Sequence, residues 1–524
     1  MTVIDYSLYL VTGRNLLPLG KDYYQSLEES LQGGVTLVQI REKHADTAEF
    51  LEIATKSKAI CDKYNVPVLI NDRIDIALAV HAHGVHLGQT DMSVAQARAM
   101  LPPGAIIGVS CNNEEHVKNA LRDGVDYIGI GAVWGTKTKK LTNPLVGVRG
   151  VGSLLEVLDG TGVKGVVIGG IKSTNLLRTL HGSVSRTNHA VDGVAVVSDI
   201  VASSEPRHAA EKLSKVLRAF KADLPISVLA VRADSARHSI IEGVVRLMKV
   251  VRELNPLVHQ ITNNVVATQS ANVTLAIGGS PIMATEPQEM EDLSRICNSL
   301  LINIGTMRSD GMLSMSRAGY FANANQKPLV FDPVGIGAST FRKDTVQELL
   351  NVFQASAIKG NAGELAALAG SVEVETKGVD SIGSGFKDPI SFVMTLARKE
   401  RCVVVLTGPV DYLSDGVTVI TLRNGHEILG KITGSGCIAG SSVATFCAAA
   451  AFESQEPPNA GKLVRGDILL GSVAGILVLT VAAEVAAARS DVKGPGTFLP
   501  ALIDELWALT PETLRSKAKL EIHA

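Results

Sequence analysis

The stretch "VTLVQIREK", residues 35–43, is a short β-branched and apolar run that ends in polar side chains at every second position. It is one of eight such runs in the first part of the chain, and a segment of helical composition follows each of them. The runs lie at residues 6–12, 35–42, 66–72, 84–88, 106–111, 127–133, 165–171 and 193–198. Nearly continuous apolar strands that alternate with helices indicate a parallel sheet covered on both faces. Eight such units predict a (β/α)8 TIM barrel, with an open doubly wound sheet as the alternative.

The alternation of strands and helices stops at "KADLPISVLAVRADSARHS", residues 221–239. A second region, richer in alanine and in long helical segments, follows it. Because 524 residues exceed what one hydrophobic core usually holds, we expect separate domains. The predicted boundaries are 1–222 for the barrel, 223–238 for a linker and 239–524 for a second α/β domain.

Positive and negative charges nearly cancel, with 50 Lys and Arg against 52 Asp and Glu. We therefore expect neither nucleic acid nor a membrane surface as a partner. Six cysteines occur without a CxxC pair, which favours free thiols in a reducing compartment. The most apolar run, 468–483, is short for a membrane span and is followed by Glu484, so we expect a buried helix. The N-terminus leads directly into a strand-like run, which predicts no signal peptide and a cytoplasmic protein.

Candidate site residues of the first region stand where its strands end, because the active site of a barrel lies at the carboxyl ends of its strands. They are Gln39, Arg41, Lys43, Asn71, Asp72, Asp91, Ser110, Thr136, Thr138, Lys139, Gly169, Gly170, Val197 and Ser198. A strand period of two places Gln39, Arg41 and Lys43 on the inner side of the barrel.

The chemistry of this set points to phosphate groups. Arg41, Lys43 and Lys139 supply positive charge, and aspartates among them indicate a divalent cation. Mg²⁺ typically takes one or two carboxylates together with substrate phosphates. Glycines and a serine after the last two strands match the phosphate cradle of such barrels. The set predicts one position for a diphosphate with metal and another for a monophosphate, and solvated loop ends are the alternative.

Seven ordered motifs of this region carry a family resemblance. They are "YLVT", "VTLVQIREK", "LINDRIDIALAVHAHGVHLGQTDM", "IGVSC", "YIGIGAVWGTKTK", "IGGI" and "GVAVVS", and they resemble thiamine-phosphate synthase. That family joins hydroxymethylpyrimidine diphosphate to a thiazole phosphate and releases pyrophosphate. The resemblance implies that Gln39, Arg41, Lys43, Asn71 and Lys139 hold the diphosphate, that Asp72 and Asp91 bind Mg²⁺, and that Thr136, Thr138, Gly169 or Gly170, Val197 and Ser198 cradle the thiazole phosphate. Ser110 would lie near the pyrimidine, where a cation forms, and Ser110 and Lys139 count as catalytic.

Three features depart from the family pattern. "VWGT" stands where the family usually has "FPT", and residues 181–190 look like an insertion between the last two strands. "HAHGVH", with His81, His83 and His86, also resembles a metal cluster, but no carboxylate or cysteine accompanies it. A zinc site is the disfavoured alternative for these histidines.

The second region contains the parts of a phosphoryl-transfer site. Asp332 ends a strand in "DPVG", and "IKGNAGE" contributes Lys359 and Glu364. "TGPVD" contributes Thr407, and Cys437 follows the glycine loop of "ITGSGC", where a helix is expected to begin. No GxxxxGK[ST] motif is present, and the absence of GxSxG disfavours a serine hydrolase. A buried small side chain is the alternative for Cys437.

These motifs, with "PLVHQITNNVVATQSANVTLAIGGSPIMA", "NIGT" and "KGPGTF", resemble hydroxyethylthiazole kinase of the ribokinase-like group. The resemblance implies that Asn263, Met283 and Gly434 contact the thiazole alcohol, that Lys359 and Thr407 contact ATP, and that Asp332 and Glu364 organise Mg²⁺. Residues 434–437 would form an anion hole, with Cys437 where related kinases carry an aspartate base. At a helix N-terminus the thiol is expected to have a lowered pKa. The family forms trimers, so a homo-oligomer built on kinase-domain trimers is expected.

The two resemblances make consecutive chemical sense, because the kinase product is the phosphate that the synthase consumes. We therefore predict a bifunctional enzyme of thiamine biosynthesis that uses ATP and Mg²⁺. One alternative is a kinase half that accepts a related alcohol such as a hydroxymethylpyrimidine. The other is a binding or regulatory protein with one inactive site.

Overall fold

The computed structural model describes residues 4–136, 138, 143–222, 233–308, 310–377, 380–382, 385–454 and 461–523. The chain divides into two compact units, residues 1–225 and residues 226–524, and each is described by itself. Helix α10 (Ala233–Leu254) begins inside the range predicted as a linker, and the first ten residues of that range, 223–232, lie outside the described residues.

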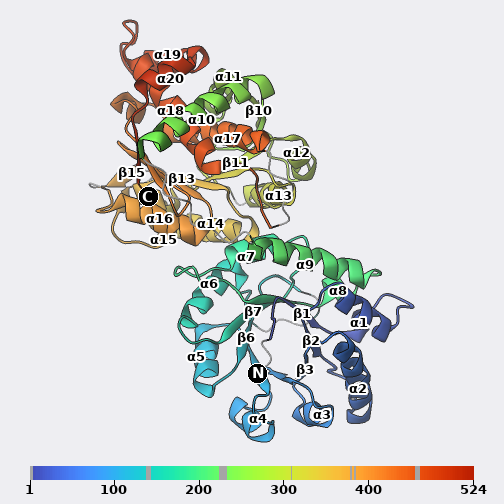
Figure 1. Cartoon of the computed structure of the whole chain (residues 1–524). Coiled ribbons are helices and arrows are strands. Elements are labelled where there is room, and N and C mark those ends of the chain that lie inside the picture. Colours follow the sequence, from blue (N-terminus) through green and yellow to red (C-terminus); the bar gives the residue numbers. More distant parts are fainter. Residues whose placement is uncertain are drawn as a thin grey trace. The chain divides into compact units, whose positions relative to one another are not determined.

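The first unit is a closed barrel of eight parallel strands in the order β1 to β8 (Figure 1). The strands are β1 (Leu8–Val11), β2 (Leu37–Ile40), β3 (Val68–Asn71), β4 (Gly84–Leu87), β5 (Ile106–Cys111), β6 (Tyr127–Ile130), β7 (Lys164–Ile168) and β8 (Gly193–Val196). Pairing of β1 with β8, Tyr9 opposite Ala195, closes the ring. The predicted TIM barrel is confirmed, and the open sheet is wrong.

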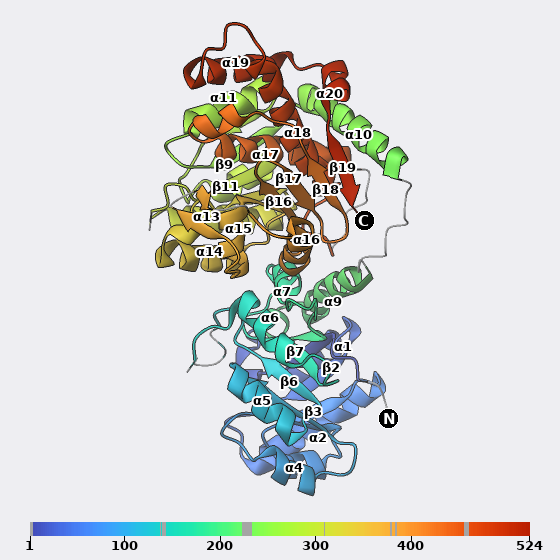
Figure 2. The same cartoon turned by 90° about the vertical axis from the view of Figure 1, so that its left-hand side faces the viewer.

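Helices cover the outside of the barrel, as Figure 2 also shows. They are α1 (Tyr23–Gln32), α2 (Thr47–Lys63), α3 (Ile74–Ala79), α4 (Val94–Met100), α5 (Glu114–Asp123), α6 (Gly147–Val157), α7 (Leu176–Gly182), α8 (Ser198–Val201) and α9 (Pro206–Ala222). Side chains of Asp46, Ser93 and Asn113 accept backbone N–H groups at the starts of α2, α4 and α5. Such caps satisfy donors that have no partner inside the helix, and they fix where each helix starts. The strands are buried on both faces, which explains their continuous apolar sequence.

The inside of the barrel is filled by a small cluster of tyrosine and aliphatic side chains. Tyr9 and Tyr127 are among its largest members, and both are fully buried. Gly108 in β5 makes room for Tyr127, because a Cβ on Gly108 would lie 2.0 Å from the tyrosine ring. The cluster therefore forms a closed floor beneath the carboxyl ends of the strands.

The second unit contains a nine-stranded sheet in the order β10-β9-β11-β12-β13-β16-β17-β18-β19. Its strands are β9 (Leu257–Ile261), β10 (Ser280–Ile282), β11 (Ser299–Asn303), β12 (Leu329–Asp332), β13 (Ala357–Asn361), β16 (Val403–Thr407), β17 (Asp411–Ser414), β18 (Val419–Leu422) and β19 (Leu520–His523), and β14 (Glu375–Lys377) pairs with β15 (Asp380–Ile382) in a separate sheet. The strands from β10 to β16 are parallel, and β17 to β19 are antiparallel to their neighbours. The carboxyl ends of five consecutive parallel strands, β9 to β16, therefore meet at one edge.

Helices lie on both faces of this sheet (Figures 1 and 2). They are α10 (Ala233–Leu254), α11 (Ala267–Ile277), α12 (Met290–Ile296), α13 (Gly311–Ala324), α14 (Thr340–Val352), α15 (Ala362–Ala369), α16 (Pro389–Glu400), α17 (Ser435–Glu453), α18 (Ile468–Ala487), α19 (Pro495–Ala508) and α20 (Pro511–Lys517). Helices α17 and α18 are apolar and long enough to cross a membrane, but 78% of each apolar window is buried inside the unit. The predicted buried helix at 468–483 is confirmed by α18, and all six cysteines of the chain are buried and form no disulfide among the described residues.

Candidate functional sites

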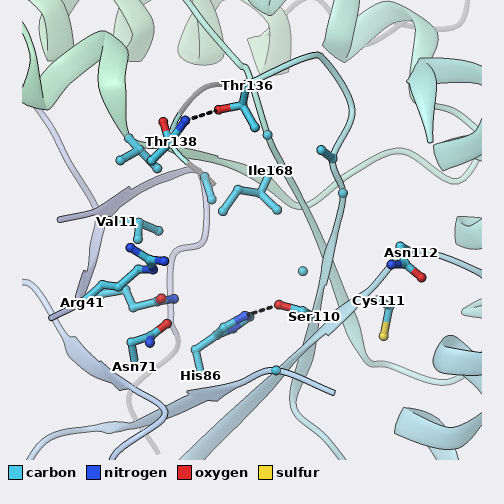
Figure 3. A pocket seen from close by; sticks show the side chains of 18 of the residues that line it. Val11, Arg41, Asn71, His86, Ser110, Cys111, Asn112, Thr136, Thr138 and Ile168 are labelled. Atoms are coloured by element: carbon cyan, nitrogen blue, oxygen red, sulfur yellow. Dashed lines mark hydrogen bonds between the residues drawn. The ribbon is translucent and has the colours of Figure 1, made fainter. Parts of the chain in front are cut away.

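A cavity of about 340 Å³ opens at the carboxyl ends of the barrel strands (Figure 3). Its lining includes Gln39, Arg41, Lys43, Asn71, Asp72, Asp91, Ser110, Thr136, Thr138, Gly169, Gly170, Val197 and Ser198. These are all of the candidates predicted for the first site except Lys139, which lies outside the described residues. Residues from seven different strand ends thus face one space, as the strand-end rule predicted.

Two aspartates and a lysine form the charged side of this cavity. Lys43 Nζ donates to Asp72 Oδ2, and Asp91 Oδ2 accepts the Gly88 N–H at 2.7 Å. Burial and a hydrogen bond with Asp91 raise the pKa of Asp72, although Lys43 acts against them. Burial would also raise the pKa of Asp91, but the bonds from Asp72 and Gly88 and the charge of Lys43 outweigh it, so that pKa is lowered. Shifts of two pKa values in opposite directions are expected for two carboxyl groups that interact closely. A divalent cation bound between them would compensate their negative charges.

The opposite side of the cavity is built from backbone. Thr138 N–H donates to Thr136 Oγ1 at 3.1 Å, and the bond is drawn in Figure 3. Gly169 and Gly170 have φ of 103° and 64°, a region that favours glycine. A Cβ on Gly170 would lie 2.5 Å from the Gly135 carbonyl oxygen, so this loop cannot carry a larger residue without moving. The arrangement brings backbone close to the cavity, as a phosphate cradle requires.

The histidines of "HAHGVH" do not converge on one point. The Nδ1 atom of His83 accepts the Val68 N–H at 3.0 Å, while His86 contacts Tyr127 OH at 2.7 Å through Nδ1 and Ser110 Oγ at 2.9 Å through Nε2. Among the residues that the structure describes, no group of three His, Cys, Asp or Glu side chains could hold a metal ion. The described residues therefore offer no three-ligand zinc site at these histidines, and any Mg²⁺ would rest on fewer protein ligands together with substrate oxygens.

The site of the second unit lies at the carboxyl ends of the parallel strands, around a buried ion pair. Lys359 Nζ lies 3.1 Å from Asp332 Oδ2, and the two side chains are 3% and 0% exposed. Lys359 also donates to the Gly436 carbonyl at 2.8 Å, which joins β13 to the start of α17. The other Asp332 oxygen, Oδ1, is buried and has no hydrogen-bond partner within the part of the chain that the structure describes. An orphaned carboxylate oxygen of this kind is suited to a cation.

Glu364 caps α15 from within its first turn. Its two oxygens accept the N–H groups of Gly335 and Asn361, each at 2.9 Å. Burial and the nearby Asp332 raise the pKa of Glu364 to about 7, against the opposing effect of Lys359 and the two N–H groups. Carboxylate oxygens retain further lone pairs, so Glu364 can still contact a metal-bound water or ligand.

Two asparagines connect Asp332 to Cys437, and sequence reasoning missed one of them. Asn303 Nδ2 donates to Asp332 Oδ2 at 2.9 Å, and Asn303 Oδ1 accepts Asn263 Nδ2 at 3.0 Å. Asn263 Nδ2 also lies 3.3 Å from Cys437 Sγ. Asn303 is the last residue of β11, and the rule that found Asp332 at the end of the next strand would have found it.

The expected low pKa of Cys437 is wrong. The residue stands in the first turn of α17, as predicted, but burial and the charge of Asp332 raise the pKa of its thiol. Lys359, Asn303 and Asn263 lower it by less. The helix terminus therefore does not by itself set the charge of this thiol, because a buried carboxylate lies close by.

The remaining predicted residues lie around the same strand ends. Gly434 is the N-cap of α17 with φ of 82°, and a Cβ there would lie 2.0 Å from Val266 Cγ1. Thr407 ends β16 opposite Asn361, and Met283 follows β10, which pairs with β9. Asp411, which the sequence did not single out, is buried beside this edge, and burial raises its pKa to about 7.

Comparisons with known proteins match the two units separately and together. The family model for thiamine monophosphate synthase matches residues 8–200, and that for the hydroxyethylthiazole kinase family matches residues 248–512. Over 99% of both chains, the sequence is 38% identical to the probable thiamine biosynthetic bifunctional enzyme of Schizosaccharomyces pombe. It is 35% identical to the thiamine biosynthetic bifunctional enzyme of Saccharomyces cerevisiae, over 98% of this chain and 97% of that one. The hydroxyethylthiazole kinase of Caldivirga maquilingensis is 42% identical over 53% of this chain and 96% of its own length. Both predicted resemblances are confirmed.

Proposed function

The chain belongs to the family of bifunctional thiamine biosynthetic enzymes, with a thiamine-phosphate synthase domain before a hydroxyethylthiazole kinase domain, and we propose that these domains catalyse consecutive reactions. The kinase domain phosphorylates the hydroxyl of 4-methyl-5-(2-hydroxyethyl)thiazole with ATP. The barrel then joins the thiazole phosphate to hydroxymethylpyrimidine diphosphate and forms thiamine phosphate and pyrophosphate. The observation that carries the proposal is the barrel cavity, which gathers cations, a carboxylate pair and a glycine cradle in one space.

In the barrel, the chain's own residues bind the diphosphate and stabilise its departure. Arg41 and Lys43 face the cavity beside Gln39 and Asn71 and would contact the phosphate oxygens, with Lys139 completing the set. Positive side chains placed at the leaving group stabilise the charge that develops on pyrophosphate. The glycine side of the cavity, with Thr136, Thr138, Val197 and Ser198, would hold the phosphate of the thiazole.

Both domains would use Mg²⁺. Asp72 and Asp91, which both line the cavity, would hold it in the barrel, and Asp332 and Glu364 would organise it in the kinase domain. Bound Mg²⁺ neutralises charge on diphosphate and triphosphate oxygens. The buried Lys359 orients Asp332 by its contact at 3.1 Å, and its charge opposes the rise that burial causes in the pKa of Asp332.

In the kinase domain, the start of α17 would receive the transferred phosphoryl group. Its N–H groups follow Gly434, and an anion at a helix N-terminus meets both free donors and the positive end of the helix dipole. Asn263 and Met283 would contact the thiazole alcohol, and Lys359 and Thr407 would contact ATP. Cys437 would accept the hydroxyl proton, a modest contribution because phosphoryl transfer depends mainly on positioning and charge stabilisation.

We also propose a cytoplasmic homo-oligomer built on kinase-domain trimers, with domain boundaries at 1–222 and 239–524. Large apolar side chains on the surface of the second unit, such as Trp507 at 74% exposure and Val265 at 64%, are suited to subunit contacts. Light scattering of the full chain tests the assembly, and a monomer at micromolar concentration would contradict it.

The test of the proposed function is a stepwise assay with the purified full chain. The chain with ATP and Mg²⁺ is offered the thiazole alcohol or hydroxymethylpyrimidine, and the phosphorylated product is measured. Hydroxymethylpyrimidine diphosphate is then added to the thiazole reaction, and thiamine phosphate is measured. We expect phosphorylation of the thiazole alcohol in preference to the pyrimidine, followed by condensation. Two results would overturn the assignment of the kinase domain. One is a preference for the pyrimidine alcohol, and the other is formation of thiamine phosphate from the thiazole alcohol without its phosphorylation.

A further inference from the structure

A continuous chain of hydrogen bonds crosses the floor of the barrel cavity. Gln39 Nε2 donates to Tyr9 OH at 2.6 Å, and Tyr9 OH lies 2.8 Å from Tyr127 OH. Tyr127 OH lies 2.7 Å from His86 Nδ1, and His86 Nε2 lies 2.9 Å from Ser110 Oγ. The last of these bonds is visible in Figure 3. The chain thus links residues of five strands, β1, β2, β4, β5 and β6.

Both ends of this chain open on the cavity, whereas its middle is sealed from solvent. Gln39, His86 and Ser110 line the cavity, while Tyr9 and Tyr127 are 1% and 0% exposed and belong to the floor beneath it. Two glycines make room for the rings of Tyr127 and His86. A Cβ on Gly108 would lie 2.0 Å from the Tyr127 ring, and a Cβ on Gly129 would lie 3.1 Å from His86 Cε1.

The donor and acceptor roles of the groups give this series of hydrogen bonds one direction. An amide nitrogen only donates, so Tyr9 OH accepts from Gln39 and turns its own proton towards Tyr127. Tyr127 then donates to His86 Nδ1, which places the imidazole proton on Nε2. His86 Nε2–H donates to Ser110 Oγ, and the serine proton is left to point elsewhere. Burial raises the pKa of both tyrosines far above neutral pH, so they keep the protons that this direction requires.

We propose that Tyr9, Tyr127 and His86 are positioning residues that hold Ser110 as a hydrogen-bond donor towards an acceptor atom of the ligand. The nature of that atom rests on the proposed function, under which it is a ring nitrogen of the pyrimidine. Gln39, which the family resemblance assigns to the diphosphate, uses its amide nitrogen on Tyr9 and keeps its carbonyl oxygen, an acceptor that suits a ring amine better than a phosphate. The two ends of the chain therefore offer a donor and an acceptor to one ring, a pair that an aminopyrimidine can satisfy.

The direction of these hydrogen bonds can be measured without substrate. In the full chain labelled with ¹⁵N-histidine, the ring nitrogen shifts of His86, assigned with His86→Gln, report which nitrogen carries the proton. We expect the Nε2–H form in the wild type and a loss of that preference in Tyr127→Phe. The Nδ1–H form in the wild type would mean that His86 donates to Tyr127, the reverse of the proposed direction, and it would overturn the proposal.

Condensation kinetics test whether the tyrosines act through Ser110. Loss of one neutral hydrogen bond corresponds to about a tenfold change, so we expect kcat/KM to fall about tenfold in Ser110→Ala and by a similar factor in Tyr127→Phe. In the double variant, Tyr127→Phe should add less than about twofold to the effect of Ser110→Ala, because the group that it positions is gone. Independent effects that multiply would contradict the proposal.

The matched control is Tyr6→Phe. The Tyr6 ring packs 5.1 Å from the Tyr127 ring in the same cluster, but its hydroxyl is outside the chain of bonds, so the rate and the His86 tautomer should both stay unchanged. The tautomer also separates this proposal from the proposed function. An Nε2–H His86 in a chain that fails to form thiamine phosphate would refute the function alone, and a reversed tautomer in an active enzyme would refute the positioning role alone.

Discussion

The two sites of this chain place charged groups at strand ends in opposite environments. In the barrel, the side chains of Lys43 and Asp72 are 41% and 19% exposed, and the cavity is open above them. In the kinase domain, Lys359 and Asp332 are 3% and 0% exposed and are held by asparagine and backbone contacts. An exposed pair contributes little to stability and rearranges easily, whereas a buried pair is preorganised and costly to break. The comparison suggests that the barrel site adjusts when its diphosphate binds, and that the kinase site is formed in advance.

The largest expected effect is on the barrel reaction. Asp72→Asn should lower condensation by about 10²- to 10³-fold and spare thiazole phosphorylation, because one of the two carboxylates proposed to hold Mg²⁺ is lost. Assays of each reaction on the same purified variant measure both. Asp75→Asn is the control, since Asp75 is exposed and pairs with Arg73 outside the cavity lining. Near wild-type condensation by Asp72→Asn would show that the metal assignment is wrong.

The corresponding substitution in the kinase domain tests the difference in burial between the two ion pairs. Asp332→Asn should abolish phosphorylation, leave condensation of supplied thiazole phosphate intact, and destabilise the second unit by about 3 kcal/mol, because Lys359 stays buried without its partner. Asp72→Asn should change stability by less than about 1 kcal/mol, as for other surface pairs. Urea unfolding followed by circular dichroism compares the two, with the exposed Asp344→Asn as control. Equal stability changes at the two sites would contradict the comparison.

Cys437 gives a smaller expected effect. Its thiol pKa is raised by burial and by Asp332, so most of the thiol is protonated at neutral pH and is a weak base. Cys437→Ala should lower the kinase rate by about 10²-fold, the low end for general-base catalysis, and Cys437→Asp should keep or improve it. The wild-type rate should rise from pH 7 to pH 9 as the thiolate fraction grows, and the alanine variant should lose this rise.

Single-turnover kinetics of the variants across pH check this role. Cys447→Ala, on the same helix and fully buried, is the control for loss of a thiol. Superimposable pH profiles for wild type and Cys437→Ala would exclude Cys437 as the base.

The last expected effect is on stability rather than on reaction rate, and it is a pH dependence at Asp411. Burial raises its pKa from 3.8 to about 7, so the folded state holds a proton that the unfolded state releases above about pH 4. Stability from this group is complete below pH 4 and is lost as the pH rises through 7, on the order of 4 kcal/mol in total. Asp411→Asn should therefore unfold at a higher temperature than wild type at pH 8 and at a similar temperature at pH 4. A constant difference across pH would show that Asp411 is ionised in the folded state.

Much of the fold and of the candidate sites could be predicted from sequence, because both depend on strand ends. Eight apolar runs gave the barrel, and polar residues after them, such as Asp72 and Ser110, gave the cavity lining. The same rule placed Asp332 and Lys359 at one sheet edge.

The features that were missed depend on which side chains meet across the barrel or the sheet. Tyr9 and Tyr127 lie within apolar strands and read as core residues, since nothing in the sequence indicates that their hydroxyls meet. The pKa of the Cys437 thiol is raised by burial and by the charge of Asp332, which is more than a hundred residues away in the chain and close in space. Local patterns fix where a residue stands, but its neighbours from other strands fix its charge and its hydrogen-bond direction.

The central claim is that two separate sites act in sequence through a phosphorylated thiazole. It is tested most directly by mixing the Asp72→Asn and Asp332→Asn chains with the thiazole alcohol, ATP, Mg²⁺ and hydroxymethylpyrimidine diphosphate. Neither variant alone should form thiamine phosphate from the alcohol, and Asp72→Asn should accumulate thiazole phosphate. The mixture should restore thiamine phosphate, because the first variant supplies what the second consumes. No product from the mixture, while each variant still performs its own retained reaction, would contradict the claim.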